Sequence, residues 1–306
     1  MRGSRAKPMA EPEVSAVVVT HNAAPWIERS LDSLRATDAE VIVVDNASTD
    51  GTPDLVRERF PEARLIEQEN RGFGAGNNAG MRAGSGRYFL LLNPDAWLME
   101  EALEAMVAFA DEHPEAAIVG PRLLNPDGTL QRSVRGYPSP WRIATEYFFL
   151  RKLAPRSSAL NAFYGGGFDH DEVRDVEVVM GACMLLRREA VELVGYCDED
   201  YFLFSEETDW CFRFHEAGWE VVFFPGADCV HVRGASHSGR LYRENLRGHL
   251  LFLSKHRGPK VAERARRLLL ASLRLRGLAF RGERGRAYRD GAAWLASADA
   301  ATLVER

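Results

Sequence analysis

The segment from Tyr88 to Asp95 constrains the fold more than any other part of the chain, because an unbroken apolar run ends there on a carboxylate. Tyr-Phe-Leu-Leu-Leu is typical of a strand buried on both faces, as in a parallel sheet covered by helices. Pro94 cannot continue a central ladder, so the strand is predicted to end before it. Asp95 is then expected at the carboxyl edge of the sheet, where open α/β sheets bind ligands; a plain polar turn is the alternative.

Two earlier segments repeat this arrangement. The apolar runs Val14–Val19 and Val41–Val44 each end on polar residues, and each is followed by signs of a helix start. Pro25 is predicted to be the first residue of one helix, and Thr52 is predicted to cap the next, with Pro53 after it. Strand, polar tip, helix and strand in succession predict a parallel βαβ sheet and hence an α/β fold. The polar residues at the strand tips are Thr20, His21, Asn22, Asp45 and Asn46.

The same order of motifs continues along the chain. The segments are VVVTHN, VVDNASTDGT, ENRGFGAGNNAG, LLNPD, VVMGACMLLRRE, VGYCDEDYFLFSEETDWCFRFHEAGWEVVFFP and VHVRGASH. Together they resemble the family-two glycosyltransferases, and most closely the bacterial rhamnosyltransferase branch, over about residues 14 to 238. The resemblance implies the GT-A nucleotide-diphospho-sugar transferase fold, with a mostly parallel central sheet flanked by helices.

Composition agrees with an enzyme of this kind. The chain has 306 residues, of which 46% are hydrophobic and 27% charged, and this is enough for a large domain plus an appendage. A net charge of −5 gives no general attraction to nucleic acid. No stretch approaches the ~18 apolar residues of a membrane span. A cytoplasmic enzyme is expected, and a peripheral position at the inner face of the cell membrane stays open. The cysteines lie far apart and suit a reducing compartment: Cys183, Cys197, Cys211 and Cys229.

Three parts are expected along the chain. Residues 1–12 are basic and polar and are predicted to be a disordered leader. Residues 13–238 are predicted to form the GT-A domain, with 13–97 as its nucleotide-binding half and 98–238 as its acceptor and catalytic half. Residues 239–306 are rich in arginine and leucine and are predicted to form a helical, basic C-terminal arm.

The C-terminal arm has two open interpretations. Gly258-Pro259 predicts a break between helices. Arginines outnumber acids between Arg240 and Arg289, but Arg274 and Arg276 are expected to interrupt a clean apolar stripe. The arm is expected either to pack on the catalytic domain or on a homodimer partner, or to attach peripherally to an anionic membrane.

The resemblance implies a donor site at the strand tips. Asp45 is expected to hydrogen-bond the nucleobase or ribose, since a carboxylate accepts from a pyrimidine N3–H or a sugar hydroxyl; an Asx turn is the alternative. His21 is expected to stack on the base, Asn70 and Gly72 to close around the nucleotide, and Asn77 to open a helix beside the sugar. The residues predicted to bind the nucleotide sugar are Thr20, His21, Asn22, Asp45, Asn70, Gly72, Asn77, Asn93 and Asp95.

One motif suggests a different class of protein. Gly74–Ala79 satisfies the G-x-G-x-x-A pattern of dinucleotide-binding enzymes, and Asp95 follows at a suitable distance. However, Gln68–Phe73 separates the pattern from the strand at Arg64–Ile66, so no tight strand-to-helix turn is present. A dehydrogenase is therefore rejected.

The segment Asn93-Pro94-Asp95 occupies the position of the family's Asp-x-Asp metal motif, with Asn93 in place of the first aspartate. Direct ligation is therefore expected of Asp95 alone, and one carboxylate with diphosphate oxygens and water suits Mg²⁺ or Mn²⁺. The ion would neutralise charge on the departing nucleoside diphosphate. A lone histidine is commonly a structural hydrogen-bonder, but the resemblance implies that His231 contacts the metal or the diphosphate.

The acidic run after Ser205 is the candidate catalytic segment. Ser205 is predicted to cap a helix, and acids in a first turn favour the helix dipole, which is the structural explanation for them. The apolar Tyr201–Phe204 before the run can also desolvate a carboxylate and raise its pKa toward that of a base. The family usually has Glu-Asp here, so the resemblance implies that Glu207 is the catalytic base. The residues predicted to support it or the acceptor are Gly181, Ala182, Glu206 and Asp209, the last through an ion pair with Arg213.

The sequence thus predicts an inverting glycosyltransferase of the hexosyltransferase class. The resemblance implies dTDP-L-rhamnose as donor and a cell-envelope or exopolysaccharide glycan as acceptor, on a polyprenyl carrier or free of one. A UDP-hexose transferase of the same fold is one alternative. A non-catalytic glycan- or nucleotide-binding homologue is another, because Asn93 and Glu207 depart from the family's usual acids. A nucleotidyltransferase is rejected because Thr20–Ala24 is no triphosphate-binding loop.

Overall fold

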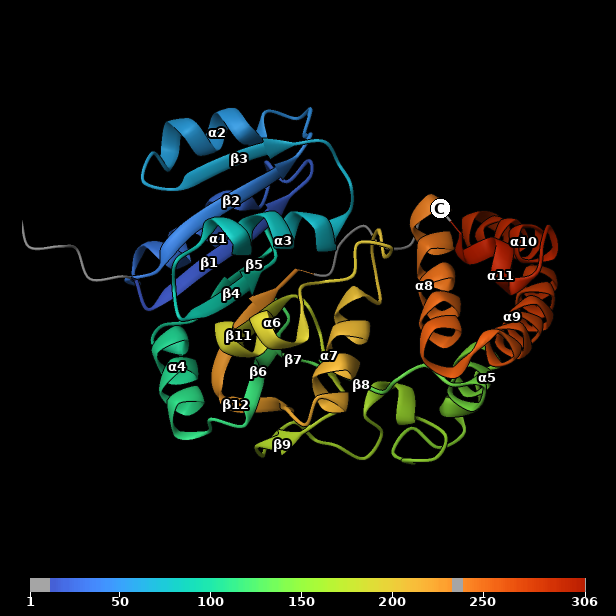
Figure 1. Ribbon diagram of the computed structural model, residues 1–306. Helices are drawn as coiled ribbons and strands as arrows, with labels where there is room; N and C mark the ends of the chain where they lie inside the picture. The colour runs from blue at the N-terminus through green and yellow to red at the C-terminus, as the bar shows by residue number, and fades with distance from the viewer. Residues whose placement is uncertain (1–11, 233–238, 306) are drawn as a thin grey trace, which may run out of the picture.

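The chain is built around one mixed sheet, in a computed structural model that describes residues 12–232 and 239–305 (Figure 1). The strand order is β3-β2-β1-β4-β11-β6-β12-β5. Its first four strands pair in parallel, as the βαβ pattern predicts, and Thr20 lies opposite Asp45 in the register. These strands are β1 (Val14–Thr20), β2 (Glu40–Asn46), β3 (Arg64–Gln68) and β4 (Tyr88–Leu92).

The second half of the sheet mixes directions. The strands involved are β5 (Ala96–Leu98), β6 (Ala116–Leu124), β11 (Cys183–Arg187) and β12 (Glu220–His231). β11 is antiparallel to both β4 and β6, whereas β12 runs parallel to β6. The chain leaves the sheet after Leu92 as expected, but it re-enters the same sheet at Ala96, beside β12 at the far edge. Asn93–Asp95 is therefore a crossing between two strands of one sheet.

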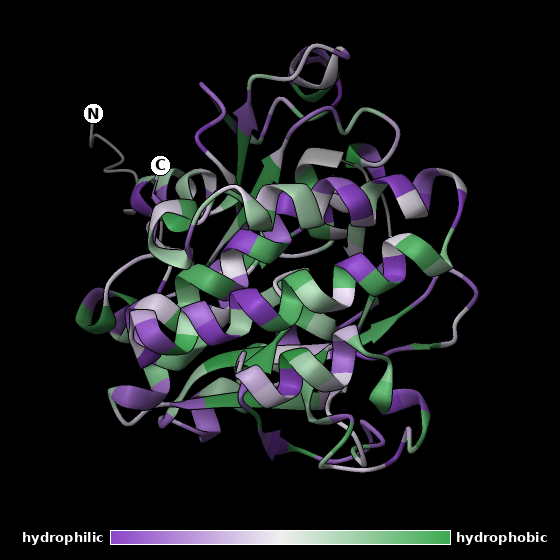
Figure 2. Ribbon diagram, turned by 90° about the vertical axis from the view of Figure 1, so that its right-hand side faces the viewer, coloured by the Kyte–Doolittle hydropathy of each residue, from purple (hydrophilic) through white to green (hydrophobic). Residues whose placement is uncertain are grey.

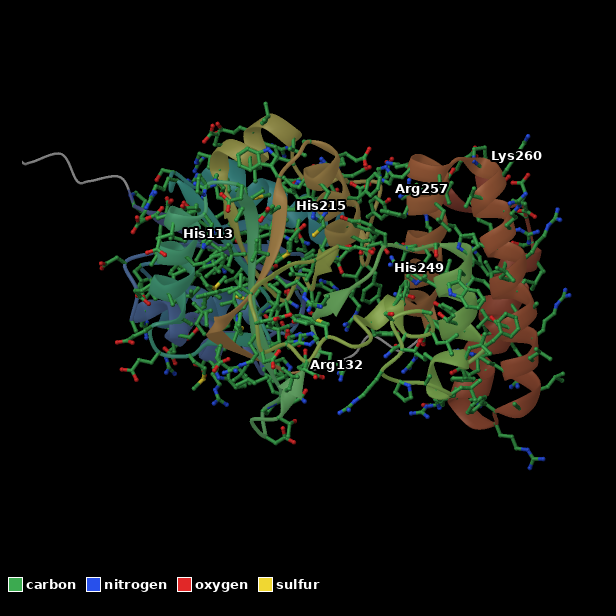
Figure 3. The ribbon with its side chains drawn as sticks, turned by 90° about the horizontal axis from the view of Figure 1, so that it is seen from below. His113, Arg132, His215, His249, Arg257 and Lys260 are labelled. Atoms are coloured by element: carbon green, nitrogen blue, oxygen red, sulfur yellow. The ribbon has the colours of Figure 1, made fainter. Side chains whose placement is uncertain are left out.

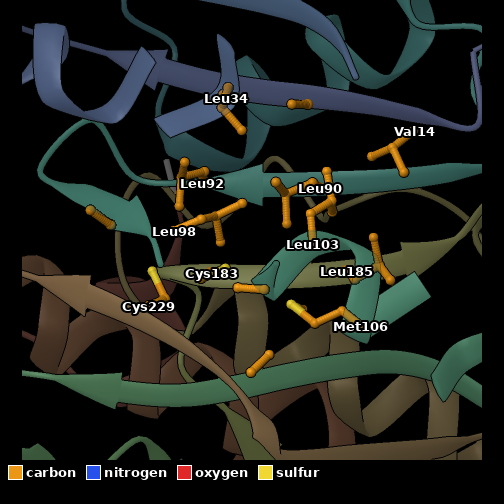
Figure 4. Close-up of a cluster of buried hydrophobic side chains, with 14 of the residues drawn as sticks. Val14, Leu34, Leu90, Leu92, Leu98, Leu103, Met106, Cys183, Leu185 and Cys229 are labelled. Carbon is orange, nitrogen blue, oxygen red and sulfur yellow. The ribbon is translucent and has the colours of Figure 1, made fainter. Parts of the chain in front are cut away.

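Helices cover both faces of the sheet, and the strands divide their side chains between two cores. Val18 packs with residues of α1 and α4, whereas its neighbour Val17 packs with residues of α3 and α7. Figure 4 shows the first core, to which Leu34 of α1, Leu90 of β4 and Leu103 of α4 contribute. The helices are α1 (Ile27–Arg35), α2 (Thr52–Arg59), α3 (Phe73–Ala83), α4 (Ala102–Glu112), α6 (Arg188–Val194) and α7 (Glu206–Glu216).

Several short elements lie between β6 and β11 on the side of the sheet nearer the arm. They are β7 (Leu130–Gln131), β8 (Val134–Arg135), α5 (Pro140–Tyr147), the 3-10 turns Leu150–Lys152 and Ala162–Tyr164, β9 (Arg174–Asp175) and β10 (Val178–Val179). β8 and β10 form a separate two-stranded sheet.

Three predicted helix starts are wrong, those at Pro25, Thr52 and Asn77, and the side-chain cap predicted for Ser205 is absent. α1 begins at Ile27, two residues after Pro25. α2 begins at Thr52 itself, after Gly51 at φ 84°, and Asp50 Oδ1 accepts from the Thr52 amide at 3.1 Å in place of a Thr52 cap. Ser205 precedes α7 but its hydroxyl makes no capping bond, because its backbone is left-handed at φ 71°. α3 begins at Phe73, so Asn77 lies inside the helix and is buried.

The C-terminal arm is entirely helical where it is described, as predicted. Its helices are α8 (Gly239–Arg257), α9 (Pro259–Ala279), α10 (Gly282–Ala296) and α11 (Ala300–Val304). Gly258, at φ 86°, separates α8 from α9 where the break is predicted. Leu246 and Leu250 of α8 share a core with Phe212 of α7 and Ile143 of α5, so the arm packs on its own chain. The arm stands beside the sheet in Figure 1.

Two of the predicted segments lie partly outside the described residues. The predicted leader, 1–12, lies almost wholly outside the described residues, as do the last motif residues before the predicted boundary at 238. Within the described part of the chain, no helix is long and apolar enough to cross a bilayer.

The glycines of α3 allow that helix to lie directly on β1, which leads to a stability prediction. A Cβ at Gly80 would overlap Val17 Cγ1. Alanine favours a helix over glycine by about 1 kcal/mol, yet Gly80→Ala should destabilise the protein by about 1–3 kcal/mol through overpacking. Urea unfolding measures the change.

The control is Gly277→Ala in α9, where the added Cβ would meet the flexible Arg289 side chain, with Cγ at 2.9 Å. This change should be neutral or stabilising. A gain in stability for Gly80→Ala would contradict the proposed contact between α3 and β1.

Candidate active site

The tips of β1 and β2 are joined by hydrogen bonds at the carboxyl edge of the sheet. The Thr20 hydroxyl donates to Asp45 Oδ1 at 2.8 Å, and the Ser48 amide donates to Asp45 Oδ2 at 2.8 Å. Thr20 and Asp45 are both buried. Each carboxylate oxygen can accept a second hydrogen bond, so Asp45 remains able to receive a donor from a ligand.

The loops around these tips are held in one arrangement. Asn22 Oδ1 accepts from the Thr49 amide at 2.8 Å, and exposed His21 contacts the Asn46 carbonyl through Nδ1 at 2.8 Å. The Asn46 side chain donates to the Gly72 carbonyl at 3.1 Å. Asn70 Oδ1 accepts from the Gly72 amide at 3.1 Å. The predicted nucleotide-binding residues that these bonds bring together are Thr20, His21, Asn22, Asp45, Asn70 and Gly72. Asn77 is inside α3.

Asp95 and His231 lie close together although they are far apart in the sequence. His231 Nε2 lies 3.5 Å from Asp95 Oδ1. His231 Nδ1 lies 2.7 Å from Gln131 Oε1, while Gln131 Nε2 donates to the His231 carbonyl at 3.0 Å and to Asn125 Oδ1 at 2.9 Å. The Gln131 oxygen therefore accepts from Nδ1–H, which leaves Nε2 of a neutral His231 with its lone pair toward a carboxylate. A metal ion held by both groups would relieve that repulsion.

Two further polar side chains lie on the segments that carry Asp95 and Gln131. The Asn93 amide donates to the Ala182 carbonyl at 2.9 Å, and the Met180 amide donates to the Ser133 carbonyl at 3.0 Å. Asn93 Oδ1 and Ser133 Oγ are buried, and neither has a hydrogen-bond partner among the described residues. Unpartnered buried oxygens beside a carboxylate and an imidazole fit a hard divalent cation and the hydroxyls of a sugar.

The fit to a metal is limited to this pair. Within residues 12–232 and 239–305, no three histidine, cysteine, aspartate or glutamate side chains gather in a way that could hold an ion. Asp95 and His231 would supply one oxygen and one nitrogen, so the remaining ligands have to come from substrate and water. This arrangement is typical of Mg²⁺ or Mn²⁺ bound together with a diphosphate.

The two glutamates at the start of α7 face different surroundings. A Cβ at Gly181 would lie 3.5 Å from Glu207 Cβ, so Glu207 faces the segment that leads into β11. A Cβ at Gly74 would lie 3.7 Å from Glu206 Cβ, so Glu206 faces the first turn of α3. Glu206 is buried, whereas Glu207 is partly exposed. Glu207 is thus the acid that adjoins Gly181, whose neighbour Ala182 accepts from the Asn93 amide.

Both glutamates have raised pKa values. Burial raises the pKa of Glu206 well above its ordinary value, and the neighbouring charge of Glu207 raises it further. Burial also raises the pKa of Glu207, while the positive charge of Arg135 moderates the rise. Glu206 Oε2 and Glu207 Oε2 have no hydrogen-bond partner among the described residues. A desolvated carboxylate without a partner has the properties of a proton acceptor.

Asp209, three residues after Glu206, has the opposite environment. The predicted ion pair is present, with Arg213 Nε 2.8 Å from Asp209 Oδ2. His256 Nε2 of α8 lies 2.7 Å from Asp209 Oδ1, and the Tyr201 hydroxyl donates to the same oxygen at 3.3 Å. These partners lower the pKa of Asp209 despite its burial. Asp209 is therefore a structural anion.

The turn into α7 is strained. Phe204 and Ser205 both have left-handed backbones, with φ of 70° and 71°. Such conformations cost on the order of 1–3 kcal/mol each for residues other than glycine, and they occur often at functional sites. Here they aim the first turn of α7, with Glu206 and Glu207, between α3 and Gly181.

Sequence reasoning missed the residues that support the site. Gln131, Ser133 and Arg135 lie on or between the short strands β7 and β8, where no motif marks them. His256 lies 47 residues from Asp209 and belongs to the arm. The only local signal is the alternation of polar residues in Leu130–Arg135, which predicts an edge strand and no particular chemistry.

Comparison with known proteins gives consistent results. The family model described as Glycosyl transferase family 2 matches residues 15–195. N-acetylglucosaminyl-diphospho-decaprenol L-rhamnosyltransferase of Mycobacterium tuberculosis is 33% identical over 248 residues, which is 76% of this chain and 80% of that protein.

Solved structures of similar fold are also known. The chain resembles GalNAc-T7 with UDP, GalNAc and Mn²⁺ at a TM-score of 0.59 and 14% identity, over 94% of this chain and 56% of that one. It resembles the mannosyltransferase PcManGT of Pyrobaculum calidifontis in complex with GDP-Man and Mn²⁺ at a TM-score of 0.55 and 19% identity, over 97% and 79% of the two chains. At these identities the likeness concerns the fold alone.

The raised pKa of Glu206 predicts how stability changes with pH. Above about pH 4.3, the ordinary value for glutamate, the unfolded chain releases a proton that folded Glu206 retains. The free energy of unfolding therefore falls as pH rises toward the folded pKa. Glu206→Gln removes this term, so the variant should be more stable than the wild type at pH 8 and equal to it below pH ~4. Urea unfolding across this pH range measures the difference.

Asp209→Asn on the same helix is the matched control. Its lowered pKa means that Asp209 stabilises the fold above about pH 3.9 and that this stabilisation disappears as pH falls through the folded value. The control should therefore be less stable than the wild type at neutral pH. If Glu206→Gln were also less stable at pH 8, the assigned environment of Glu206 would be wrong.

Proposed function

Because this chain belongs to glycosyl transferase family 2, we propose that it transfers L-rhamnose from dTDP-L-rhamnose to a lipid-linked glycan of the cell envelope. The fold is the GT-A fold and the protein is an inverting glycosyltransferase, as the sequence motifs implied. The observation that carries the proposed mechanism is the carboxylate of Glu207. It is desolvated, its Oε2 has no hydrogen-bond partner among the described residues, and it lies beside Gly181.

Glu207 is the general base in this proposal. It takes the proton from an acceptor hydroxyl, and the hydroxyl oxygen then forms a bond to the anomeric carbon of the donor sugar. The bond from that carbon to the diphosphate breaks, and the nucleoside diphosphate leaves with the electron pair. Attack from the face opposite the leaving group inverts the anomeric centre in one step. Glu206 faces α3 and takes no part in proton transfer.

The donor nucleotide is proposed to bind along the tips of β1 and β2. Asp45 would accept from the base or ribose, Thr20 and Asn22 would flank the base, and His21 is exposed for stacking on it. The unpartnered oxygens of Asn93 and Ser133 would accept or exchange hydrogen bonds with sugar hydroxyls. Gly181 and Ala182 leave room for the sugar because they carry little or no side chain.

A divalent ion is proposed at Asp95 and His231. When bound, Mg²⁺ or Mn²⁺ neutralises negative charge that develops on the departing diphosphate. Asp95 would hold it through a carboxylate oxygen and His231 through Nε2, the atom that Gln131 leaves unprotonated. The two similar structures that contain Mn²⁺ support this choice for the fold.

The acceptor class follows from the mycobacterial relative. That protein's name describes rhamnosyl transfer to N-acetylglucosaminyl-diphospho-decaprenol. We extend this class, a sugar on a polyprenyl diphosphate, to the present chain. The enzyme is proposed to act at the cytoplasmic face of the membrane, and the division into residues 1–12, 13–238 and 239–306 remains part of the proposal. A homodimer is not needed, because the arm packs on its own α5 and α7.

Two alternative functions predict different results in donor-binding and turnover measurements. A UDP-hexose transferase would share the fold and the base but prefer another donor. A non-catalytic binding homologue would bind the nucleotide sugar without turnover. The Oε2 atom of Glu207 argues for catalysis, because an oxygen that accepts no hydrogen bond among the described residues is available to take a proton from an acceptor.

The assignment of the base is tested by substitution. Glu207→Gln retains size and polarity but cannot take a proton, so turnover should fall by ~10²- to 10⁴-fold with donor affinity nearly unchanged. Glu207→Asp should retain substantial activity, because the family usually has aspartate there. Glu206→Gln is the neighbouring control and should remain active. Wild-type turnover in Glu207→Gln together with an inactive Glu206→Gln would transfer the role to Glu206.

The donor and the metal are tested together by calorimetry. Titration of dTDP-L-rhamnose with Mg²⁺ or Mn²⁺ should give tighter binding than titration of a UDP-hexose, and a chelator should weaken it. Asp95→Asn should remove the effect of the chelator while the unfolding curve stays unchanged. Equal affinity with and without chelator in the wild type would exclude the metal role. Tighter binding of the UDP-hexose would exclude the rhamnose donor.

A further inference from the structure

We infer that the outer face of α9 is a docking surface for an anionic lipid bilayer. This inference goes beyond the proposed function, because it depends on a surface of the arm and not on the active site. The outer face of α9 is defined by its exposed basic and leucine residues, which are Lys260, Arg264, Arg267, Arg274, Leu275 and Leu278.

These residues form a single stripe. At about 100° per residue, their positions along the helix fall within roughly 100° of its surface. Figure 3 shows Lys260 on the outer side of the arm, whereas His249 of α8 lies on its inner side. Figure 2 looks onto the arm and shows hydrophilic and hydrophobic segments interspersed along the helices nearest the viewer.

The opposite face of α9 is fixed in the protein core. Leu269 and Leu273 are fully buried in the core of the arm. Arg276, expected to interrupt an apolar stripe, is instead on this inner face. Its Nε donates to the Tyr147 carbonyl at 2.7 Å, and its guanidinium lies 4.0 Å from the Phe149 ring centre. The expected interruption is therefore wrong, and the outer stripe contains only residues that face solvent.

The leucines at the end of the stripe are unusually open. Leu278 is 86% exposed and Leu275 is 57% exposed, so most of the surface of each side chain is open to solvent. Arg274 is adjacent to them, and exposed arginines continue beyond the helix at Arg281 and Arg284. Open leucines bordered by arginine are typical of surfaces that insert into the headgroup region of a bilayer.

The charge of the surface selects the kind of membrane. Glu263 borders the stripe, but it is already engaged by both Arg266 and Arg267, with distances of 2.7 and 2.9 Å. Glu283 is the acid nearest the arginines that follow the helix in the sequence. The outer face of α9 is thus basic in a chain whose net charge is −5, and it is complementary to anionic headgroups.

Other occupants fit this surface less well. A second copy of the chain related by a two-fold axis would place the basic stripe against itself, and like charges across an interface are unfavourable. Nucleic acid would match the charge but would leave Leu275 and Leu278 in contact with water or phosphate. A bilayer satisfies both features, since its headgroups meet the arginines and its acyl boundary receives the leucines.

Docking through α9 would also position the rest of the enzyme. α9 follows α8 directly, and α8 is tied to the catalytic helix through His256 and Asp209. A membrane contact at the arm therefore holds the transferase domain at the bilayer, where a polyprenyl-linked acceptor is located. This consequence rests on the proposed function, but the docking itself does not.

Vesicle flotation tests the inference with the full chain. The protein should float with phosphatidylcholine vesicles that contain phosphatidylglycerol at low salt, and less at high salt because salt screens the charges. It should float weakly with phosphatidylcholine alone. The triple variant Arg264→Gln, Arg267→Gln, Arg274→Gln should lower partitioning by about a hundredfold, from about fivefold for each basic residue removed. The double variant Leu275→Asp, Leu278→Asp should abolish flotation.

Matched controls separate the surface from overall charge and hydrophobicity. Arg35→Gln, Arg57→Gln, Arg59→Gln changes the net charge equally on α1 and α2, where these arginines are also exposed. Leu193→Asp changes a leucine that is 72% exposed on α6. Both controls should float like the wild type, and all variants should keep the wild-type unfolding curve.

Two results would overturn the inference. One is a wild-type protein that does not float with anionic vesicles at low salt. The other is flotation that the α9 variants do not reduce more than their controls. If the protein did not float but sedimented as a dimer that Leu275→Asp, Leu278→Asp dissociates, the face would instead be an interface between two copies. Activity of the wild type toward the donor would stand in each case, so failure here leaves the proposed function intact.

Discussion

The geometry of the site depends on the buried carboxylate of Asp209. It accepts from Arg213 on its own helix, contacts His256 on α8 and accepts from Tyr201 in the segment before α7. Arg213 in turn donates to the Tyr196 carbonyl at 2.7 Å. One anion therefore ties together the catalytic helix, the strained turn that starts it and the arm. Leaving such a buried charge without partners costs about 3–5 kcal/mol, so these elements are expected to move as a unit or not at all.

The same helix turn divides three acids into different roles. Asp209 has cationic and hydroxyl partners that lower its pKa, whereas burial without such partners raises the pKa of Glu206 and Glu207. Helix geometry then separates the two glutamates, since adjacent residues point about 100° apart. Glu206 meets α3, and Glu207 meets Gly181 at the sheet. The partners and the directions of the three side chains therefore distinguish their roles. Asp209 is a structural anion, Glu206 faces α3, and Glu207 is the candidate base.

The sequence predicts correctly those features that depend on short, continuous segments. A buried strand ends where polar residues begin, so Thr20, Asp45 and Asp95 were placed at one sheet edge from short segments alone. It failed where structure is decided by distant partners. The antiparallel insertion of β11 between β4 and β6, the Gln131 contact that sets the His231 tautomer, and the His256 contact to Asp209 all join segments far apart in sequence. The predicted start of α3 at Asn77 is wrong because the preceding glycines do not form a loop. They belong to the helix, where they permit close packing on β1.

In helix α9 of the arm, one arginine is buried and two leucines are exposed, which is the opposite of the usual distribution of these residues. Arg276 is buried, but carbonyl groups and aromatic rings satisfy its guanidinium, so its position is explained within the fold. Leu275 and Leu278 are exposed and have no comparable explanation, since water is an unfavourable neighbour for a leucine side chain. Replacing them with polar residues would cost the folded state little packing. The inferred role of these leucines is therefore a contact outside the folded chain, and the arginines around them favour an anionic surface as the partner.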